Sequence, residues 1–197
     1  CVAGPRPVSL QLAEDDAKAG PLPVLGGTVQ AFPLRHRAPC CGYAFTLPRA
    51  GRFDPDRARA LGIPVRLWRT LQSGQPAGGF RPQQVLGPPR RGLKVVYAAD
   101  TRPCGPLEQA AQDADLLCMD STYPPDDFRD KAREYGHATC PEAGRLAAAA
   151  GVRRLWLTHY SAAVTDPAEG LAAAQAAFPA AEAGFDGKRL ELNFDGD

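Results

Sequence analysis

The stretch "PEAGRLAAAAGVRRLWLTH", residues 141–159, determines the expected fold class. Its first part, 141–151, predicts a helix, because Pro141 suits the first helical position and Gly151 suits a helix end. The apolar run 154–158 that follows has the length and composition of a strand. A helix that leads directly into a buried strand is typical of layered α/β proteins.

The rest of the chain repeats this alternation. Further short apolar runs predict strands, and two further Ala-rich or Leu-containing stretches predict helices. The predicted strands cover residues 8–12, 28–34, 42–47, 94–99, 115–119 and 189–194, and the helices cover 106–112 and 167–178. Because strands and helices alternate in its second half, the sequence predicts an α/β fold.

Composition sets the protein class. A length of 197 residues with 44% hydrophobic residues fits one domain with a real core, and twenty Gly and twenty Pro argue against a helical bundle. No run of about 18 apolar residues and no secretory signal pattern occurs, so we expect a soluble, cytoplasmic protein without a membrane span.

The six scattered cysteines, with no CxxC pair, predict reduced thiols. The chain begins with Cys1, so we expect further sequence upstream.

Positive charge is concentrated in one segment. Between Thr46 and Lys94 there are ten basic and two acidic residues, a balance of +8 in a chain whose net charge is +1. Residues 48–92 are rich in Pro, Gly and Arg, with short helical candidates at 54–62 and 65–74, and predict an inserted arm with little core of its own. Such a segment can attract a polyanion, or can be a solvated arginine-rich loop.

Three predicted strands are followed by residues that can bind a metal. His36 follows the run 28–34, Asp100 follows 94–99, and His159 follows 154–158. Strand ends of this kind converge at one edge of an α/β sheet, where ligands bind. Two imidazoles and one carboxylate suit zinc or manganese. Each residue also has a structural interpretation, as a hydrogen-bonded histidine or, for Asp100, as a turn or cap residue.

The third histidine, His137, lies in a loop ahead of a predicted helix, beside Thr139. A histidine in this position can contact an anion or act as an acid, and it can also be a polar cap residue. Asp120 follows the run 115–119 and would orient His137 if the two loops face one another. The carboxylate would then favour the protonated imidazole.

Four segments together resemble ribonuclease Z, the metallo-β-lactamase-fold endonuclease that trims the 3′ end of precursor transfer RNA. They are "AFPLRHRAPCCGY" (31–43), "VVYAADTRPC" (95–104), residues 136–162 and "FP" (178–179), in the family's order and spacing. The resemblance implies an αββα sandwich and two divalent metal ions, usually zinc, with manganese as the other option. It also implies a homodimer, since the family commonly presents one subunit's arm to another's site.

The resemblance assigns metal and catalytic roles residue by residue. His36 would bind the first metal, Asp100 would bridge both, and His159 would bind the second. His137 would protonate the leaving 3′ oxygen, with Asp120 as its carboxylate partner.

It also assigns contacts with the substrate. The arm, 48–92, would grip the elbow of the transfer RNA, with Arg66 and Arg69 on the arm and Thr139 near the site as substrate-binding residues.

The sequence departs from the family pattern in several places. The HxHxDH motif, which supplies four of the seven ligands, is absent, so residues 1–197 are predicted to be the C-terminal portion of a metallo-β-lactamase domain, incomplete at its N-terminus and inactive alone. Asp120 replaces a glutamate, "SAAV" follows Tyr160 where an ending like "SARY" is usual, and the arm lacks "PPGP". Two alternatives remain: another phosphodiesterase or hydrolase of this fold, and a non-catalytic RNA-binding remnant.

Overall fold

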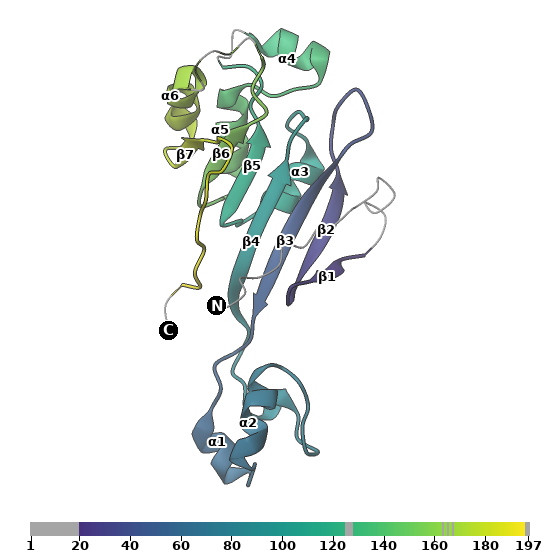
Figure 1. Cartoon of the computed structure of the whole chain (residues 1–197), viewed down its shortest axis with the longest axis vertical. Helices are drawn as coiled ribbons and strands as arrows, with labels where there is room; N and C mark the ends of the chain where they lie inside the picture. The colour runs from purple at the N-terminus through teal and green to yellow at the C-terminus, as the bar shows by residue number, and fades with distance from the viewer. Residues whose placement is uncertain (1–19, 125–127, 163, 165, 167, 196–197) are drawn as a thin grey trace, which may run out of the picture.

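A computed structural model describes residues 20–124, 128–162, 164, 166 and 168–195. These residues form a seven-stranded mixed sheet with helices packed on one face, and a small lobe extends from one end of the sheet (Figure 1). The strands lie in sequence order: β1 (Leu22–Val24), β2 (Gly27–Pro33), β3 (Cys41–Arg49), β4 (Arg90–Ala98), β5 (Leu116–Asp120), β6 (Leu155–Thr158) and β7 (Ala181–Ala183).

Strand direction changes at the middle of the sheet. The pairs from β1 to β4 are antiparallel, and the pairs from β4 to β7 are parallel. Consequently β2 runs in the same direction as β4, β5 and β6, and these four strands all end at one edge. That edge is where the sequence places its candidate metal ligands.

Helices α3 (Gly105–Ala111), α5 (Cys140–Ala149) and α6 (Ala168–Ala177) belong to the main helical layer, and α4 (Arg129–Tyr135) lies near the site edge (Figure 1). The main apolar core lies between the sheet and this layer, and it includes Val96, Leu117 and Leu157. Helices α5 and α6 approach closely at Gly144, where an added Cβ would lie 2.6 Å from the Ala174 carbonyl oxygen. Glycine therefore permits this packing.

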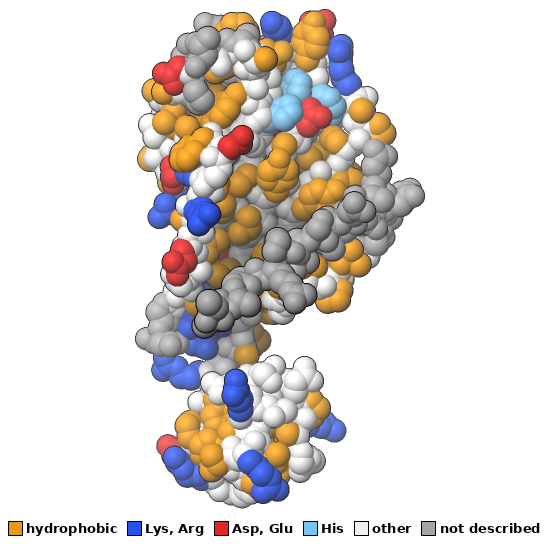
Figure 2. Space-filling view, viewed as in Figure 1, with side chains coloured by type: hydrophobic (Ala, Val, Ile, Leu, Met, Phe, Trp, Pro, Cys, Tyr) orange, Lys and Arg blue, Asp and Glu red, His pale blue; other side chains and the backbone are white. Residues whose placement is uncertain are grey.

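The opposite face of the sheet also carries large apolar side chains. Tyr43, Tyr97, Cys118 and Trp156 are successive register partners across four strands, and Tyr97 is half exposed. Apolar side chains are visible on this face in Figure 2. The described residues form one sheet, whereas the αββα sandwich has two, so the coarser expectation of a mixed α/β fold is the one confirmed here.

The inserted lobe leaves the sheet after β3 and returns at β4. It contains α1 (Pro55–Ala60), α2 (Val65–Gln72) and a 3-10 turn, η2 (Pro82–Gln84). The lobe has a small apolar cluster of its own, with Trp68 packed against it. Its buried members are Ala58, Ile63, Leu71 and Val85. Apolar positions four residues apart bury one face of α2 and leave its arginines in solvent.

Other elements depart from the sequence predictions. Residues 189–194 form no strand, and β7 at Ala181–Ala183 pairs with β6 as the last strand of the sheet. Strand β1 and helix α4 were not predicted, and the predicted strand 8–12 lies outside the described residues. Within the described part of the chain, no helix has the length and hydropathy needed to cross a bilayer.

Candidate metal centre

Five candidate site residues gather at the edge where β2, β4, β5 and β6 end. His36, Asp100 and His159 lie just beyond their strands, and Asp120 is the last residue of β5. His137 reaches the same place from the turn between α4 and α5. Figure 2 shows the histidine side chains together around an acidic side chain at the surface.

Asp100 is at the centre of this group. Its Oδ1 lies 3.4 Å from Nε2 of His36, 3.9 Å from Nε2 of His159 and 3.6 Å from Nδ1 of His137. Potential ligand atoms of Asp100, Asp120, His137 and His159 all lie within 4.8 Å of one another. Nitrogen and carboxylate oxygen atoms at this spacing can hold a divalent transition-metal ion.

His36 is oriented by the backbone. Its Nδ1 lies 3.0 Å from the carbonyl oxygen of Gly136, so Nδ1–H donates there and Nε2 faces Asp100 with its lone pair. Gly136 ends α4 in the left-handed conformation, with φ of 85°. An added Cβ on Gly136 would lie 2.8 Å from Nδ1 of His36.

We expect Gly136→Ala to weaken metal binding and stability together. The left-handed backbone costs an alanine about 1 kcal/mol, and the new methyl group pushes His36 away from Asp100. Zinc titration with a competing chelator should show about a tenfold loss of affinity, the size expected for an outer-sphere partner. Gly62→Ala is the matched control, since Gly62 also has positive φ but no atom near its Cβ. Equal zinc affinity in the two variants would contradict the role given to Gly136.

His159 is oriented by Thr122 and Asp120. Its Nδ1 lies 3.2 Å from the Thr122 hydroxyl and 3.4 Å from Oδ2 of Asp120, which leaves Nε2 facing Asp100. The Asp120 hydrogen bond raises the pKa of His159, against a smaller opposing effect of burial. His159 and Asp100 both have left-handed backbone, with φ of 59° and 57°. Strained residues of this kind cluster at functional sites.

Asp120 accepts hydrogen bonds on both carboxylate oxygens. Its Oδ2 accepts from Nδ1 of His137 at 2.9 Å and from the backbone N–H of Thr101 at 3.0 Å. Its Oδ1 accepts from the backbone N–H and hydroxyl of Thr122, at 3.0 and 2.9 Å, and from the N–H of Ala138 at 3.3 Å. The side chain is fully buried. Its oxygens are thus committed to protein donors, and Asp120 organises the loops around it.

The ionised form of Asp120 is favoured in spite of its burial. Burial alone raises the pKa of this carboxyl, but hydrogen bonds from His159, His137 and Thr122 together outweigh it and hold the pKa below its ordinary value. Because an ionised carboxylate only accepts, Nδ1 of His137 carries the proton in this pair, and Nε2 is left for other partners. The same Nδ1 lies 3.6 Å from Oδ1 of Asp100.

The predicted substrate-binding residues lie elsewhere. Thr139 is fully buried and caps α5, where its hydroxyl accepts from the N–H of Glu142, so its observed role is structural. Arg66 and Arg69 are exposed on α2 of the lobe, which joins the end of β4 opposite to Asp100. The structure does not bring these three residues together, and their contacts with substrate stay predictions.

Three supporting residues were not predicted from the sequence: Thr101, Thr122 and Gly136. Thr122 carried a weak signal, because it lies two residues after Asp120, where a hydroxyl can return to the carboxylate. Thr101 follows Asp100 directly, and its hydroxyl lies 3.1 Å from the N–H of Arg35. This contact joins the loop after β2 to the loop after β4.

Comparison with known proteins agrees with this geometry. Residues 44–160 match the model of the beta-lactamase superfamily domain. The chain belongs to the beta-lactamase superfamily. Within it, the chain is a homologue of ribonuclease Z, so the resemblance in the sequence motifs is confirmed. It is 37% identical over 198 residues to ribonuclease Z of Lachnospira eligens, covering 98% of this chain and 65% of that protein.

A second relative, ribonuclease Z of Salinibacter ruber, is 46% identical over 151 residues, covering 74% of this chain and 47% of that protein. The chain thus spans between about half and two thirds of the length of these two relatives. Among solved structures, the metallo-beta-lactamase fold protein YhfI from Bacillus subtilis matches with a TM-score of 0.56 at 18% identity. That match covers 84% of this chain and 50% of YhfI, and it supports the fold alone.

Proposed function

We propose that the complete protein is a metal-dependent endoribonuclease that cuts precursor transfer RNA at its 3′ end. The observation that carries this proposal is the position of Asp100, whose Oδ1 lies within 4 Å of a ring nitrogen of each of the three histidines. Homology to ribonuclease Z supports precursor transfer RNA as the substrate class. A carboxylate surrounded by imidazoles can bind metal ions, and bound metal ions promote the hydrolysis of a phosphodiester bond.

The donor set fits divalent metal ions. His36 and His159 each have Nδ1 held by a protein partner and Nε2 facing Asp100, which is the usual orientation of histidine ligands. We propose that His36 binds one ion, His159 a second, and Asp100 both, with zinc the preferred metal and manganese acceptable. When bound, such a pair lowers the pKa of a water molecule and neutralises charge on the phosphate.

His137 supplies the proton in this proposal. Its Nδ1–H donates to the buried carboxylate of Asp120, which fixes the orientation of the ring. The proton on Nε2 is then transferred to the 3′ oxygen as it leaves phosphorus. Asp120 holds the ring in place and keeps its own charge throughout, as expected for an orienting carboxylate.

The remaining ligands must come from another segment. We propose that a preceding segment supplies HxHxDH and a second sheet, and that this sheet packs on the apolar face formed by Tyr43, Tyr97, Cys118 and Trp156, completing the αββα sandwich. A hollow of about 380 Å³ on this face reaches from Trp156 to His159, so the second sheet would border the metal centre. The chain alone is then inactive.

The lobe is proposed to bind transfer RNA. Its exposed arginines, including Arg66 and Arg69, suit phosphate contacts. Because the lobe and Asp100 lie at opposite ends of β4, one chain cannot bring both to the same short stretch of RNA. A homodimer would place one subunit's lobe near the other's metal centre, and we propose this assembly in the cytoplasm.

The test compares this chain with a version extended upstream to include HxHxDH. With zinc, the extended protein should release the 3′ trailer of a precursor transfer RNA, and the 197-residue chain should not. Asp100→Asn in the extended protein should abolish release. An extended protein that binds two zinc ions and hydrolyses bis-p-nitrophenyl phosphate, but leaves the RNA intact, would contradict the substrate proposal.

A further inference from the structure

The segment that follows β7, residues 185–195, begins on the apolar face of the sheet. Nζ of Lys188 lies 4.8 Å from the ring centroid of Trp156. Phe185 lines the same hollow as Trp156 and Tyr97. The backbone N–H of Lys188 donates to the carbonyl oxygen of Phe185 at 3.0 Å, which closes a turn between β7 and the rest of the segment.

The other end of this segment is held at the end of the sheet that carries the lobe. Both carboxylate oxygens of Asp195 accept hydrogen bonds from the guanidinium group of Arg153, at 2.8 and 2.5 Å. Its backbone carbonyl accepts from Arg49, the last residue of β3, at 2.6 Å. The guanidinium carbon of Arg49 also lies 4.8 Å from the ring centroid of Phe194. In Figure 1 the yellow tail accordingly descends from β7 toward the lobe.

Between these two anchors the chain has the side-chain pattern of a strand. Leu190 and Leu192 are partly buried, and the residues on either side of each are exposed. Such an alternation places successive side chains on opposite sides of the backbone. Within the described part of the chain, the backbone of residues 189–194 makes no hydrogen bond. An extended segment with unpaired backbone groups is a template on which another strand can pair.

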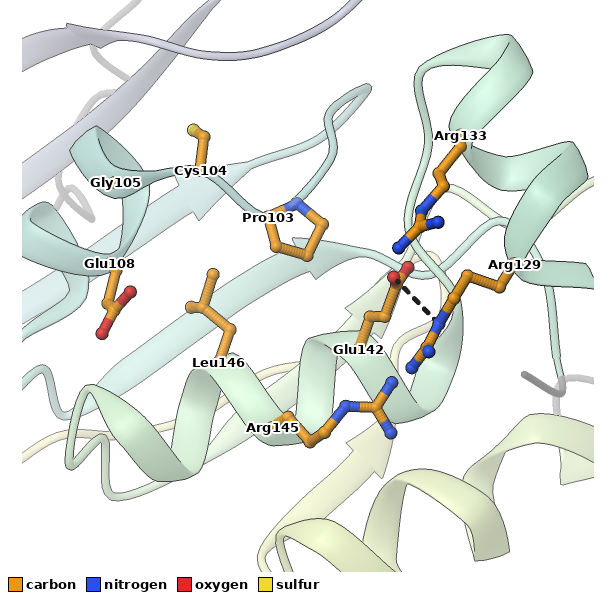
Figure 3. Close-up of a pocket in the computed structure, with 9 residues that line it drawn as sticks. All are labelled: Pro103, Cys104, Gly105, Glu108, Arg129, Arg133, Glu142, Arg145 and Leu146. Carbon is orange, nitrogen blue, oxygen red and sulfur yellow. Dashed lines mark ion pairs between the residues drawn. The ribbon is translucent and has the colours of Figure 1, made fainter.

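The opposite face of the sheet is covered by the helical layer. The pocket in Figure 3 lies between α3, α4 and α5, and in it Nε of Arg129 pairs with Oε1 of Glu142 at 3.5 Å. Side chains of the helices thus line even this hollow. The face left for a second sheet is the one that carries Tyr97 and Trp156, where the segment begins.

The two ribonuclease Z relatives have enough additional length for a second sheet. The chain covers 65% of one and 47% of the other, so between about one third and one half of each relative has no counterpart in it. Strands are usually about 5–6 residues long, so a segment of this size can supply several strands.

We propose that residues 189–194 are a strand of the second sheet and that a strand of the preceding segment pairs with their backbone. The inference rests on the proposed function for the existence of the second sheet, and it assigns to this chain the strand on which that sheet is assembled. The partner is an alternating strand whose apolar side chains face Tyr97 and Trp156, in step with Leu190 and Leu192. Because both ends of the segment are anchored, it is extended before its partner pairs with it, which lowers the entropy cost of pairing.

Hydrogen exchange followed by mass spectrometry tests this pairing in the 197-residue chain and in the version extended upstream. In the 197-residue chain, the amides of residues 190–194 should exchange at nearly the rate of an unstructured peptide, because they have no acceptor among the described residues. In the extended protein, at least every second amide should exchange about 100-fold more slowly or less. The amides of β6, which pairs with β5 and β7, should be protected in both proteins and serve as the reference.

Proline variants test the same pairing through thermal stability. Glu191→Pro and Leu192→Pro remove N–H groups that point to opposite edges of the strand, and Glu191→Ala and Leu192→Ala are the matched controls that keep them. In the extended protein, at least one proline variant should melt about 4 °C or more below its alanine control. In the 197-residue chain, each proline variant should melt within about 1 °C of its control, because no backbone hydrogen bond is lost.

Three outcomes would overturn the inference. One is fast exchange throughout residues 190–194 in the extended protein. Another is that both proline variants of the extended protein melt with their alanine controls. The third is protection in the 197-residue chain that rises with protein concentration, which would assign the open strand edge to a second copy of the chain.

The proposed function fails separately from this inference. If residues 190–194 are protected in the extended protein but precursor transfer RNA is not cleaved, the strand pairing stands and the reaction does not. If the extended protein cleaves the RNA while these amides exchange as fast as in the 197-residue chain, the reaction stands and the strand pairing does not.

Discussion

Asparagine in place of Asp120 should lower the free energy of unfolding by about 3 kcal/mol or more. The substitution is nearly isosteric, but it replaces one accepting oxygen by an NH₂ group that faces donors. On one oxygen these are the ring N–H of His137 and the N–H of Thr101, and on the other the N–H groups of Thr122 and Ala138. Either rotamer leaves buried donors unsatisfied, because the side chain is fully buried.

Urea unfolding of the 197-residue chain, followed by circular dichroism, measures this effect. Asp130→Asn is the matched control, since Asp130 is fully exposed and meets Arg133 only at 4.0 Å. Its unfolding free energy should stay within about 0.5 kcal/mol of the parent's. A loss below 1 kcal/mol for Asp120→Asn would mean that the carboxylate does not organise the loops as its hydrogen bonds indicate.

Asparagine in place of Asp100 should instead lower zinc affinity strongly and change the free energy of unfolding little. Asp100→Asn should lower zinc affinity by about 100-fold or more, because the charged oxygen shared by the three histidines is lost, a larger effect than that of an outer-sphere partner. Stability should change by less than about 1 kcal/mol, since the side chain is 45% exposed. Asparagine is chosen because it tolerates the left-handed backbone at this position.

Competition between the protein and a chromogenic chelator for zinc gives the affinity, and the urea experiment gives the stability of the same samples. Asp113→Asn is a suitable control, because Asp113 also has a left-handed backbone, with φ of 54°, and lies outside the metal centre. If Asp100→Asn keeps parental zinc affinity, the metal centre is not built around this residue.

Strands and helices with strong local signals were predictable. The run 154–158 corresponds to β6, Leu155–Thr158, and the stretch 141–151 to α5, Cys140–Ala149. The segment 189–194 alternates as a strand should, but it pairs with no strand in the structure. Ala181–Ala183 has a weak strand composition and still completes the sheet, since β6 offers it an open edge. Pairing partners are a property of the folded chain, and they override local preference.

Helix α4 was missed for a related reason. Its sequence, "RDKAREY", is short and mostly charged, and Ala132 is its one buried residue, so it lacks an apolar periodicity. The candidate metal centre was more accessible to prediction, because strand direction brings His36, Asp100 and His159 to one edge. Gly136 could not be found in this way, since its contact with His36 joins residues 100 positions apart.

The left-handed backbone at Asp100 and His159 has an evolutionary consequence. Each of these two conformations costs about 1 kcal/mol that glycine would avoid. A domain that had lost its catalytic activity and only bound nucleic acid would be more stable with glycine at either position. At both positions the sequence has the side chain that costs stability, and both side chains belong to the candidate metal centre.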